Sequence, residues 1–399
     1  MANAAEIVPI IDVDTHLSEP PDLWTSRLPQ KWKDQAPYVA FNPELGVEDW
    51  FCGDLRLVTP GFLAMAGHDE YTPNFPKSYE EMPPGAWQSK ARLEVMDEAG
   101  VYASVLYPNI LAFYSWAFQE MQDQALAFAC HSVYNEFVAE FASEDRNRLI
   151  PTCVVPFWDI EESVRELRRS RELGITALLF GWQYDKIGLP PIHDEHWEPI
   201  LKTAEELGMS INLHVAVGTR TEQDTSEVNR AWNDWRSADY ARLCSLVMVS
   251  NSEAIALLTT SGLLERYPGL KWVSVESGFG YIPMLMESLD WQWMNGGAFK
   301  DHPNQMMPSE AFREYMYCSF WFEKQSLPLL EHWSDNVMFE SDYPHPTCLH
   351  PGAASIAKSP RDTAVENMSA LPAEVVRKVL WDNPAKLYGV RKPIDFPAL

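Results

Sequence analysis

Short apolar runs alternate with amphipathic stretches along most of the chain, and this repeated order limits the fold more than any other feature. Eight runs have the character of buried strands: PIIDVD, VYASVLYP, RLIPTCVVPF, ITALLFG, MSINLHV, LKWVSVES, YCSFWF and VMFESDYPH. Nearly all precede a helical segment, and Gly174 and Gly208 stand where two of these helices are expected to end. Eight parallel strand–helix units predict a closed (β/α)8 TIM barrel.

An open, doubly wound sheet is the main alternative. Its usual dinucleotide-binding form carries GxGxxG after the first strand, and no such motif occurs there. Residues 17–89, rich in proline and tryptophan, are too long for a simple connection. We expect them to form an insertion over the C-terminal face of a single domain spanning residues 1–399. A separate domain is the alternative.

Composition narrows the partners. The formal net charge of -26 argues against nucleic acid and against anionic membrane surfaces, so a small-molecule substrate is expected. The N-terminus lacks the features of a signal peptide and no run reaches the length of a membrane span, which predicts a cytoplasmic protein. Six scattered cysteines without a CxxC pair indicate neither a disulfide scaffold nor a zinc ribbon.

Polar residues gather where the predicted strands end. Asp14 and His16 end the first strand two residues apart, so they share a face. His214 lies in the fifth strand, Glu276 ends the sixth, and Asp342 ends the eighth with His345 three residues later. Each alone has a structural explanation, such as a turn, a helix cap or a satisfied core histidine.

Together these six side chains predict a metal centre. The C-terminal ends of barrel strands meet at one face, and carboxylates and imidazoles gathered away from water need a compensating cation. Three histidines and three carboxylates suit one or two divalent ions of zinc, iron or manganese.

The same segments resemble the amidohydrolase superfamily, in the amidohydrolase 2 branch that includes aminocarboxymuconate semialdehyde decarboxylase. The resemblance runs from IDVDTH through INLHV and VESGFGYIP to ESDYPHP and WDNPAKLYGV. It implies a (β/α)8 barrel with a mononuclear or dinuclear metal site. The family's His-x-His pair resembles Asp14-x-His16, its fifth-strand histidine resembles His214, and its eighth-strand aspartate resembles Asp342.

Two positions depart from the family pattern. Asp14 replaces the first histidine of the pair, and Glu276 stands where the family has the histidine of an HGG element. Both changes exchange a neutral donor for an anionic one, which favours iron or manganese over zinc and could accommodate two ions.

Three functions follow as hypotheses. The first is a metal-dependent hydrolase or decarboxylase for a small, carboxylate-bearing substrate, with Asp342, Glu276 and His214 as catalytic residues. The alternative is a dinuclear iron, or iron and manganese, oxygenase that hydroxylates a C–H bond. The third is a structural partner without catalysis, because YIPMLMESLDWQWM could pack against another subunit. Association with like or related chains is expected in any case.

Several further residues could contact substrate, although core packing or helix capping would explain each of them. The candidates are Trp24, Trp182, His193 and Trp321, with His196 close to the third. His131 and His332 lie within helical patterns and are expected to be structural.

Overall fold

The computed structural model describes residues 3–71, 74–217 and 238–396. Its main sheet has eight strands in the order β1-β5-β6-β7-β8-β9-β10-β11, and all neighbouring pairs are parallel. The strands are β1 (Ile10–Leu17), β5 (Val101–Pro108), β6 (Leu149–Cys153), β7 (Ala177–Phe180), β8 (Ser210–His214), β9 (Trp272–Val275), β10 (Met316–Phe320) and β11 (Val337–Phe339). All eight predicted strands are present, and the predicted barrel architecture is confirmed.

The sheet closes between β1 and the segment that follows β11. The backbone N–H of Asp342 donates to the carbonyl of Asp14 over 2.9 Å, and that of His16 donates to the carbonyl of Tyr343 over 2.6 Å. Thr15 also forms a parallel bridge with Tyr343. These links bring the polar ends of the first and eighth strands side by side.

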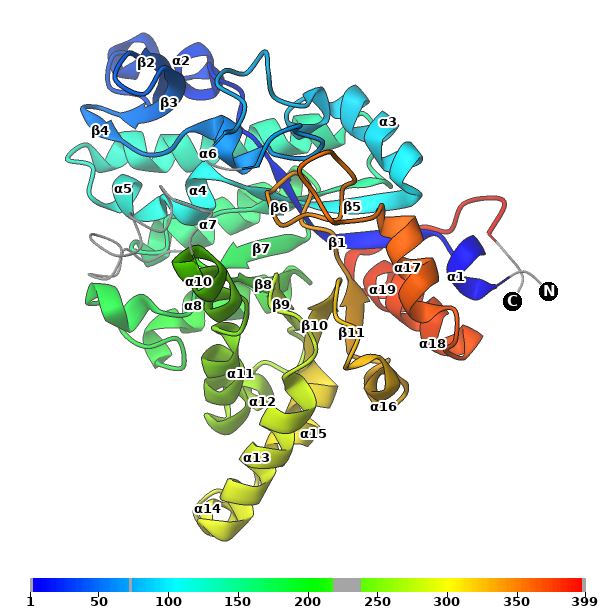
Figure 1. The fold of residues 1–399 in the computed structure, drawn as a ribbon. Helices are drawn as coiled ribbons and strands as arrows, with labels where there is room; N and C mark the ends of the chain where they lie inside the picture. The colour runs from blue at the N-terminus through cyan, green and yellow to red at the C-terminus, as the bar shows by residue number, and fades with distance from the viewer. Residues whose placement is uncertain (1–2, 72–73, 218–237, 397–399) are drawn as a thin grey trace.

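Helices cover the outside of the barrel (Figure 1). The longer ones are α3 (Ser89–Ala99), α6 (Gln124–Ala142), α7 (Ile160–Glu172), α8 (Glu198–Glu206), α10 (Ala238–Met248), α11 (Asn251–Thr260), α13 (Ile282–Asn295), α15 (Pro308–Tyr315) and α17 (Pro360–Met368). The shorter ones are α1 (Ala4–Ile7), α2 (Leu23–Arg27), α4 (Ile110–Phe113), α5 (Ser115–Gln119), α12 (Leu263–Arg266), α14 (Ala298–Asp301), α16 (Leu330–Trp333), α18 (Ala373–Arg377) and α19 (Asn383–Tyr388). Gly174 and Gly208 follow α7 and α8 with φ of 93° and 65°, the left-handed conformation that ends a helix.

The segment between β1 and α3 contains a small antiparallel sheet of β2 (Tyr38–Asn42), β3 (Val47–Cys52) and β4 (Leu55–Arg56). Backbone hydrogen bonds join Met65 to Pro344 and Ser18 to Ala86, both over 2.9 Å. The segment therefore lies beside the C-terminal ends of β1 and β11. The assignment of residues 1–399 to one domain stays a prediction.

Helix α13 projects away from the barrel with α14 at its tip (Figure 1). It exposes Met284 at 71%, Trp291 at 69% and Met294 at 49%. Self-association through such a surface stays a prediction.

Among the helices of the described ranges, none has the length and apolar character needed to cross a bilayer.

Candidate metal centre

Strand β1 delivers the first two donors. All eight of its residues are buried, so Asp14 and His16 are held away from solvent. The ring of His16 stacks on those of His345 and Phe113, with centroids 3.8 and 5.5 Å away. This packing fixes the direction in which His16 Nε2 points.

The backbone sets the tautomers of His16 and His214. Nδ1 of His16 lies 3.3 Å from the carbonyl of Pro108, and Nδ1 of His214 lies 2.8 Å from that of Val215. A carbonyl only accepts, so each Nδ1 carries a proton and each Nε2 is left with a lone pair. The two Nε2 atoms face one another at 2.9 Å. Only a proton or a metal ion between them makes this arrangement favourable.

Carboxylates surround the same point. Asp14 Oδ1 lies 3.6 Å from Nε2 of both histidines, and Glu276 Oε2 lies 3.5 Å from Nε2 of His214. Asp342 Oδ1 lies 3.7 Å from Nε2 of His16. Both oxygens of Asp14 and Oδ1 of Asp342 are buried, and no described residue donates a hydrogen bond to them. Such atoms are rare unless a ligand meets them.

Two of the donors occupy unusual backbone conformations. Glu276 has φ of 52° and Asp342 has φ of 60°, in the left-handed region that residues other than glycine seldom adopt. Each conformation costs on the order of 1 kcal/mol and persists where the surrounding structure enforces it, commonly at functional sites. The backbone is therefore held so that both carboxylates point into the centre.

The pKa values express the same excess of negative charge. Burial and the charge of Asp342 raise the pKa of Glu276 well above its usual range, and burial and the charge of Asp14 do the same for Asp342. Burial opposes protonation of His214, yet Asp14 and Glu276 outweigh it and raise its pKa to about 9. Burial, followed by the charge of His345, lowers the pKa of His16. The centre attracts a cation.

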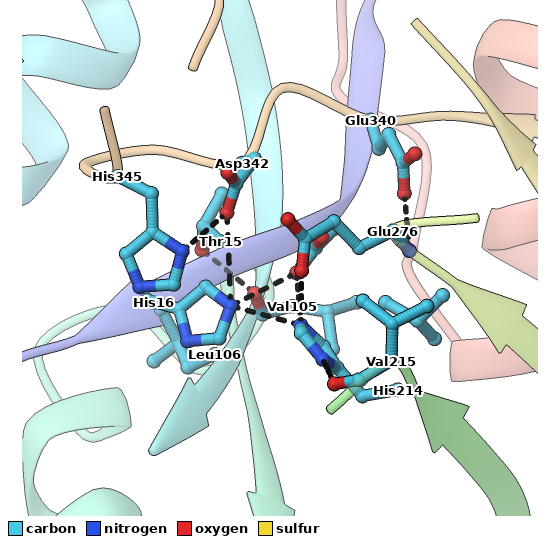
Figure 2. Close-up of polar contacts among 12 residues, drawn as sticks. Thr15, His16, Val105, Leu106, His214, Val215, Glu276, Glu340, Asp342 and His345 are labelled. Atoms are coloured by element: carbon cyan, nitrogen blue, oxygen red, sulfur yellow. Dashed lines mark hydrogen bonds and ion pairs between the residues drawn. The ribbon is translucent and has the colours of Figure 1, made fainter. Parts of the chain in front are cut away.

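The donor set fits a divalent metal. Donor atoms of Asp14, His16, His214 and Glu276 lie within 4.8 Å of one another, as do those of His16, Asp342 and His345. Two ligand atoms bound at about 2.1 Å to one ion lie about 3.0 to 3.4 Å apart, close to the separations found here. Figure 2 shows five of these side chains converging from β1, β8 and the ends of β9 and β11: His16, His214, Glu276, Asp342 and His345. All six residues predicted as ligands come together.

Sequence reasoning missed three neighbours of the centre. Asn109 Oδ1 lies 3.0 Å from Nε2 of His345, and the hydroxyl of Thr347 donates to Asp342 Oδ2 over 2.6 Å. Glu340 Oε2 accepts the backbone N–H of Glu276 over 3.1 Å. Asn109 directly follows β5, so the strand-end rule that found the others would have included it.

A second buried polar cluster, here called the latch, adjoins the centre and consists of Asp12, Thr15, Arg92 and Ser341. Asp12 accepts hydrogen bonds from the backbone N–H groups of Asp14 and Ser341 and from the Ser341 hydroxyl. Arg92 donates to the carbonyls of Gly85 and His16 and to the Thr15 hydroxyl. The latch fixes β1 against the segment after β11.

A small pocket with mainly apolar walls lies at the same end of the barrel. Its walls follow β6, β7 and β8 and include Phe157, Phe180, Tyr184 and Val217. Val217 comes three residues after His214, and Leu111 of α4 also contributes to the lining. Apolar walls of this kind are typical of sites that bind small organic molecules.

The residues predicted to contact substrate are dispersed. Trp24 is fully buried, donates to the carbonyl of Cys130 and packs against Trp50. Trp182 and Trp321 follow β7 and β10 at the C-terminal face and are buried. The carbonyl of His193 accepts a hydrogen bond from Arg266. None of these contacts involves the metal donors, and their role in substrate binding stays a prediction.

His131 lies on the barrel's outer layer. Its Nδ1 is 2.9 Å from the carbonyl of Ala127, and its ring packs against Phe118 and Trp158. The carbonyl of His332 accepts a hydrogen bond from Arg313. These contacts agree with the structural roles expected for both histidines.

Comparison with known proteins identifies the class. A barrel with buried nitrogen and oxygen donors at its C-terminal face defines a metal-dependent (β/α)8 enzyme. The model of the amidohydrolase family, Amidohydro_2, matches residues 11–390, and the chain belongs to this family. The family resemblance inferred from the motifs is confirmed.

Two relatives are decarboxylases. The chain is 23% identical over 330 residues to 2-amino-3-carboxymuconate-6-semialdehyde decarboxylase of Dictyostelium discoideum. This match covers 82% of this chain and 81% of the relative. The chain is also 25% identical over 292 residues to gamma-resorcylate decarboxylase of Rhodococcus jostii. This match covers 68% of this chain and 82% of the relative.

Solved structures share the fold. An amidohydrolase of Mycobacterium avium subsp. paratuberculosis superposes with a TM-score of 0.70 at 20% identity, covering 96% of this chain and 99% of its own. A 5-carboxyvanillate decarboxylase of Novosphingobium aromaticivorans, solved with bound manganese, superposes with a TM-score of 0.64 at 15% identity. It covers 96% of this chain and 97% of its own.

Proposed function

We propose that this protein catalyses the metal-dependent decarboxylation of a small organic acid, in the class of hydroxylated aromatic carboxylates. The observation that carries the proposal is the buried centre of Asp14, His16, His214 and Asp342, with carboxylate oxygens that no described residue satisfies. The decarboxylase relatives support the reaction type. A divalent ion held there would bind the substrate carboxylate and a neighbouring oxygen and withdraw electron density from them.

The protein's own residues account for the remaining requirements. Decarboxylation breaks a C–C bond, releases CO2 and leaves an electron pair on carbon that must take up a proton. Glu276 is the most exposed of the donors, with 14% of its side chain accessible, so its carboxyl can meet both the centre and a bound substrate. Since Oε2 faces His214 and the metal point, we assign Oε1 of Glu276 as the atom that delivers this proton. The apolar side chains of Phe157, Phe180 and Val217 beyond His214 would pack against the ring.

His214 and Asp342 orient the reacting groups in this proposal. The carbonyl of Val215 fixes the His214 ring, and Thr347 fixes one oxygen of Asp342. In a hydrolytic variant of the reaction, Asp342 would instead take a proton from the attacking water. The same barrel would then act on an amide, ester or lactone.

The test is turnover of a panel of hydroxylated aromatic carboxylates and small amides by manganese-loaded protein under strict anaerobiosis, followed by CO2 release and product analysis. The proposal predicts CO2 release without oxygen. It also predicts that Glu276→Gln lowers kcat about 100-fold or more while the protein still binds its metal ion. Amide cleavage without CO2 release would indicate hydrolysis and contradict decarboxylation.

One observation favours a second candidate, a dinuclear oxygenase. The donors form two overlapping groups that are rich in carboxylate and imidazole, a set suited to iron. Such an enzyme would use O2 and two external electrons to insert one oxygen atom into a C–H bond and release the other as water. Product formation that requires both O2 and a reductant would establish this function in place of decarboxylation.

A further inference from the structure

The turn that carries Glu276 has an uncommon backbone. It spans residues 276–280, with the sequence ESGFG, and follows β9 directly. Glu276 has φ of 52° and Gly278 has φ of 69°, so two of its first three residues lie in the left-handed region. Glycine adopts this region without steric cost, but a residue with a Cβ atom does not. Glu276 therefore keeps its conformation only because other contacts hold the turn.

The side chain of Glu323 supplies such contacts from the segment after β10. Its Oε1 accepts the backbone N–H of Phe279 over 2.6 Å and that of Gly280 over 3.3 Å. Its Oε2 accepts the backbone N–H of Trp321 over 3.0 Å. Hydrogen bonds to a carboxylate are stronger than those between neutral groups, and consecutive N–H groups after a left-handed residue form a concave site for an anion. Glu323 thus ties the turn to the end of β10.

The turn and the Glu323 carboxylate fit closely. A Cβ atom at residue 278 would lie 2.7 Å from Oε1 of Glu323, nearer than such atoms approach, so Gly278 is required for this contact. At the start of the turn, the backbone N–H of Glu276 donates to Oε2 of Glu340 over 3.1 Å (Figure 2). Two carboxylates therefore hold the turn, one at its first residue and one at its last two.

These contacts fix the direction of the Glu276 side chain. Its Oε2 lies 3.5 Å from Nε2 of His214. If residue 276 relaxed to a negative φ, its Cβ atom would leave the backbone in a different direction, and the carboxyl would turn away from the centre. Among the described residues, Glu323 belongs to neither group of candidate metal donors. It can act on the centre only through the turn.

We propose that Glu323 is a positioning residue for Glu276. By binding the N–H groups of Phe279 and Gly280, it holds the turn so that the Glu276 carboxyl faces the centre and a bound substrate. This role rests on the proton delivery assigned to Glu276 under the proposed function. Glu323 itself contacts neither the substrate nor the metal ion in this proposal.

A double-mutant cycle tests this role. The measurement is CO2 release by manganese-loaded protein, with the hydroxylated aromatic carboxylate that the wild type converts fastest. Glu323→Ala should lower kcat about 10- to 100-fold, because misplacing a reacting group by about 1 Å has effects of this size. In the Glu276→Gln background the same change should lower kcat less than about 3-fold, since no carboxyl remains to be positioned. Equal losses in both backgrounds would overturn the proposal.

Two further variants complete the cycle. Glu205 Oε1 accepts the backbone N–H of Gly269 over 2.8 Å, ahead of β9 at the opposite end of that strand. Glu205→Ala is therefore a matched control and should keep the wild-type kcat. Glu323→Gln keeps the volume of the side chain, but its NH2 group must face at least one backbone N–H. It gives the same cycle should Glu323→Ala not fold.

A crystal structure of the metal-free Glu323 variant separates this role from the reaction. Glu276 should leave the left-handed region, and its carboxyl should move at least about 1 Å from its place beside His214. An unmoved Glu276 would overturn the role of Glu323 whatever reaction the enzyme catalyses. If wild-type protein released no CO2, the proposed function would fail instead, and this structure would still decide whether Glu323 positions Glu276.

Discussion

The latch and the metal centre are adjacent and equally buried, but they satisfy their polar atoms in opposite ways. In the latch, Asp12 accepts three hydrogen bonds and Arg92 donates three. In the centre, both oxygens of Asp14 lack a donor among the described residues. Burial alone therefore does not distinguish a metal-binding carboxylate from a structural one in this protein. The absence of hydrogen-bond donors to the Asp14 oxygens does distinguish it, because such oxygens are left to bind a cation.

Matched amide substitutions on one strand should show the largest difference. Asp14→Asn should reduce metal affinity and activity at least about 100-fold, since it removes a charged donor, while the free energy of unfolding of the metal-free protein stays the same or rises. Asp12→Asn should change metal affinity and the free energy of unfolding little. The amide oxygen of the new asparagine can accept the two backbone N–H groups, and its NH2 group can donate to Ser341. Calorimetric metal titration and chemical denaturation measure both quantities. Equal metal loss in the two variants would remove the distinction.

Truncation of the latch should affect stability more than an amide does. Asp12→Ala leaves the hydroxyl and backbone N–H of Ser341 and the N–H of Asp14 without their acceptor. We expect the free energy of unfolding to fall by about 3 to 5 kcal/mol, at about 1 to 3 kcal/mol for each buried group left unpaired. Urea denaturation of metal-free protein checks it. A loss below about 1 kcal/mol would mean that water or backbone movement replaces Asp12.

Glu19 is an intermediate case, because Oε1 accepts two backbone N–H groups while no described residue donates to Oε2. Burial raises its pKa from 4.5 to about 7. Between these values the folded protein keeps a proton that the unfolded chain has lost, so the free energy of unfolding falls as pH rises. The decrease should be on the order of 3 kcal/mol and end near pH 7.

Glu19→Gln provides the measurement for this pH dependence. Denaturation of both proteins from pH 4.5 to pH 8 gives a difference in which other groups, such as His131 with its pKa lowered to about 4 by burial, cancel. Wild type should lose stability relative to the variant up to about pH 7. Parallel curves would show that Glu19 is not protonated in the fold.

The smallest change concerns the support of a metal ligand. Thr347→Val removes the hydroxyl that donates to Asp342 Oδ2. Metal affinity should fall about 10-fold, equal to about 1.4 kcal/mol, because outer hydrogen bonds orient the ligand. Competition with a fluorescent chelator measures the affinity. Thr347→Ser, which keeps the hydroxyl, should bind metal as wild type does, and equal weakening in both variants would point to packing instead.

The sequence predicted the barrel and the six side chains that the structure brings together at its C-terminal face, because strand alternation and strand-end position are local properties. Alternation alone, however, places Asp12 and Asp14 on one face and gives no reason for their different roles. The pairing of β1 with β5 is irregular between Asp12 and Thr15, and such an irregularity redirects side chains. Asp12 turns to Ser341 and Asp14 to the histidines. This difference in direction depends on how β1 pairs with β5, which the sequence of β1 alone does not show.

The inserted sheet also escaped prediction for a physical reason. The sequence of strand β2, YVAFN, does not alternate between apolar and polar residues. This agrees with its position in the fold, where every residue of the strand is half-buried or exposed. Arg92 was missed because its partners are mainly backbone carbonyls, and one of them, that of His16, is 76 residues away in the sequence. Residue type carries no information about such contacts.

The most direct test of the metal centre is a crystal structure of metal-loaded wild-type protein with anomalous data at the metal edge. We expect a peak between Nε2 of His16, Nε2 of His214 and Oδ1 of Asp14, within about 2.0 to 2.3 Å of each. Crystals at saturating metal with no anomalous peak near Asp14, and with the two Nε2 atoms still in direct contact through a proton, would show that these residues do not bind a metal.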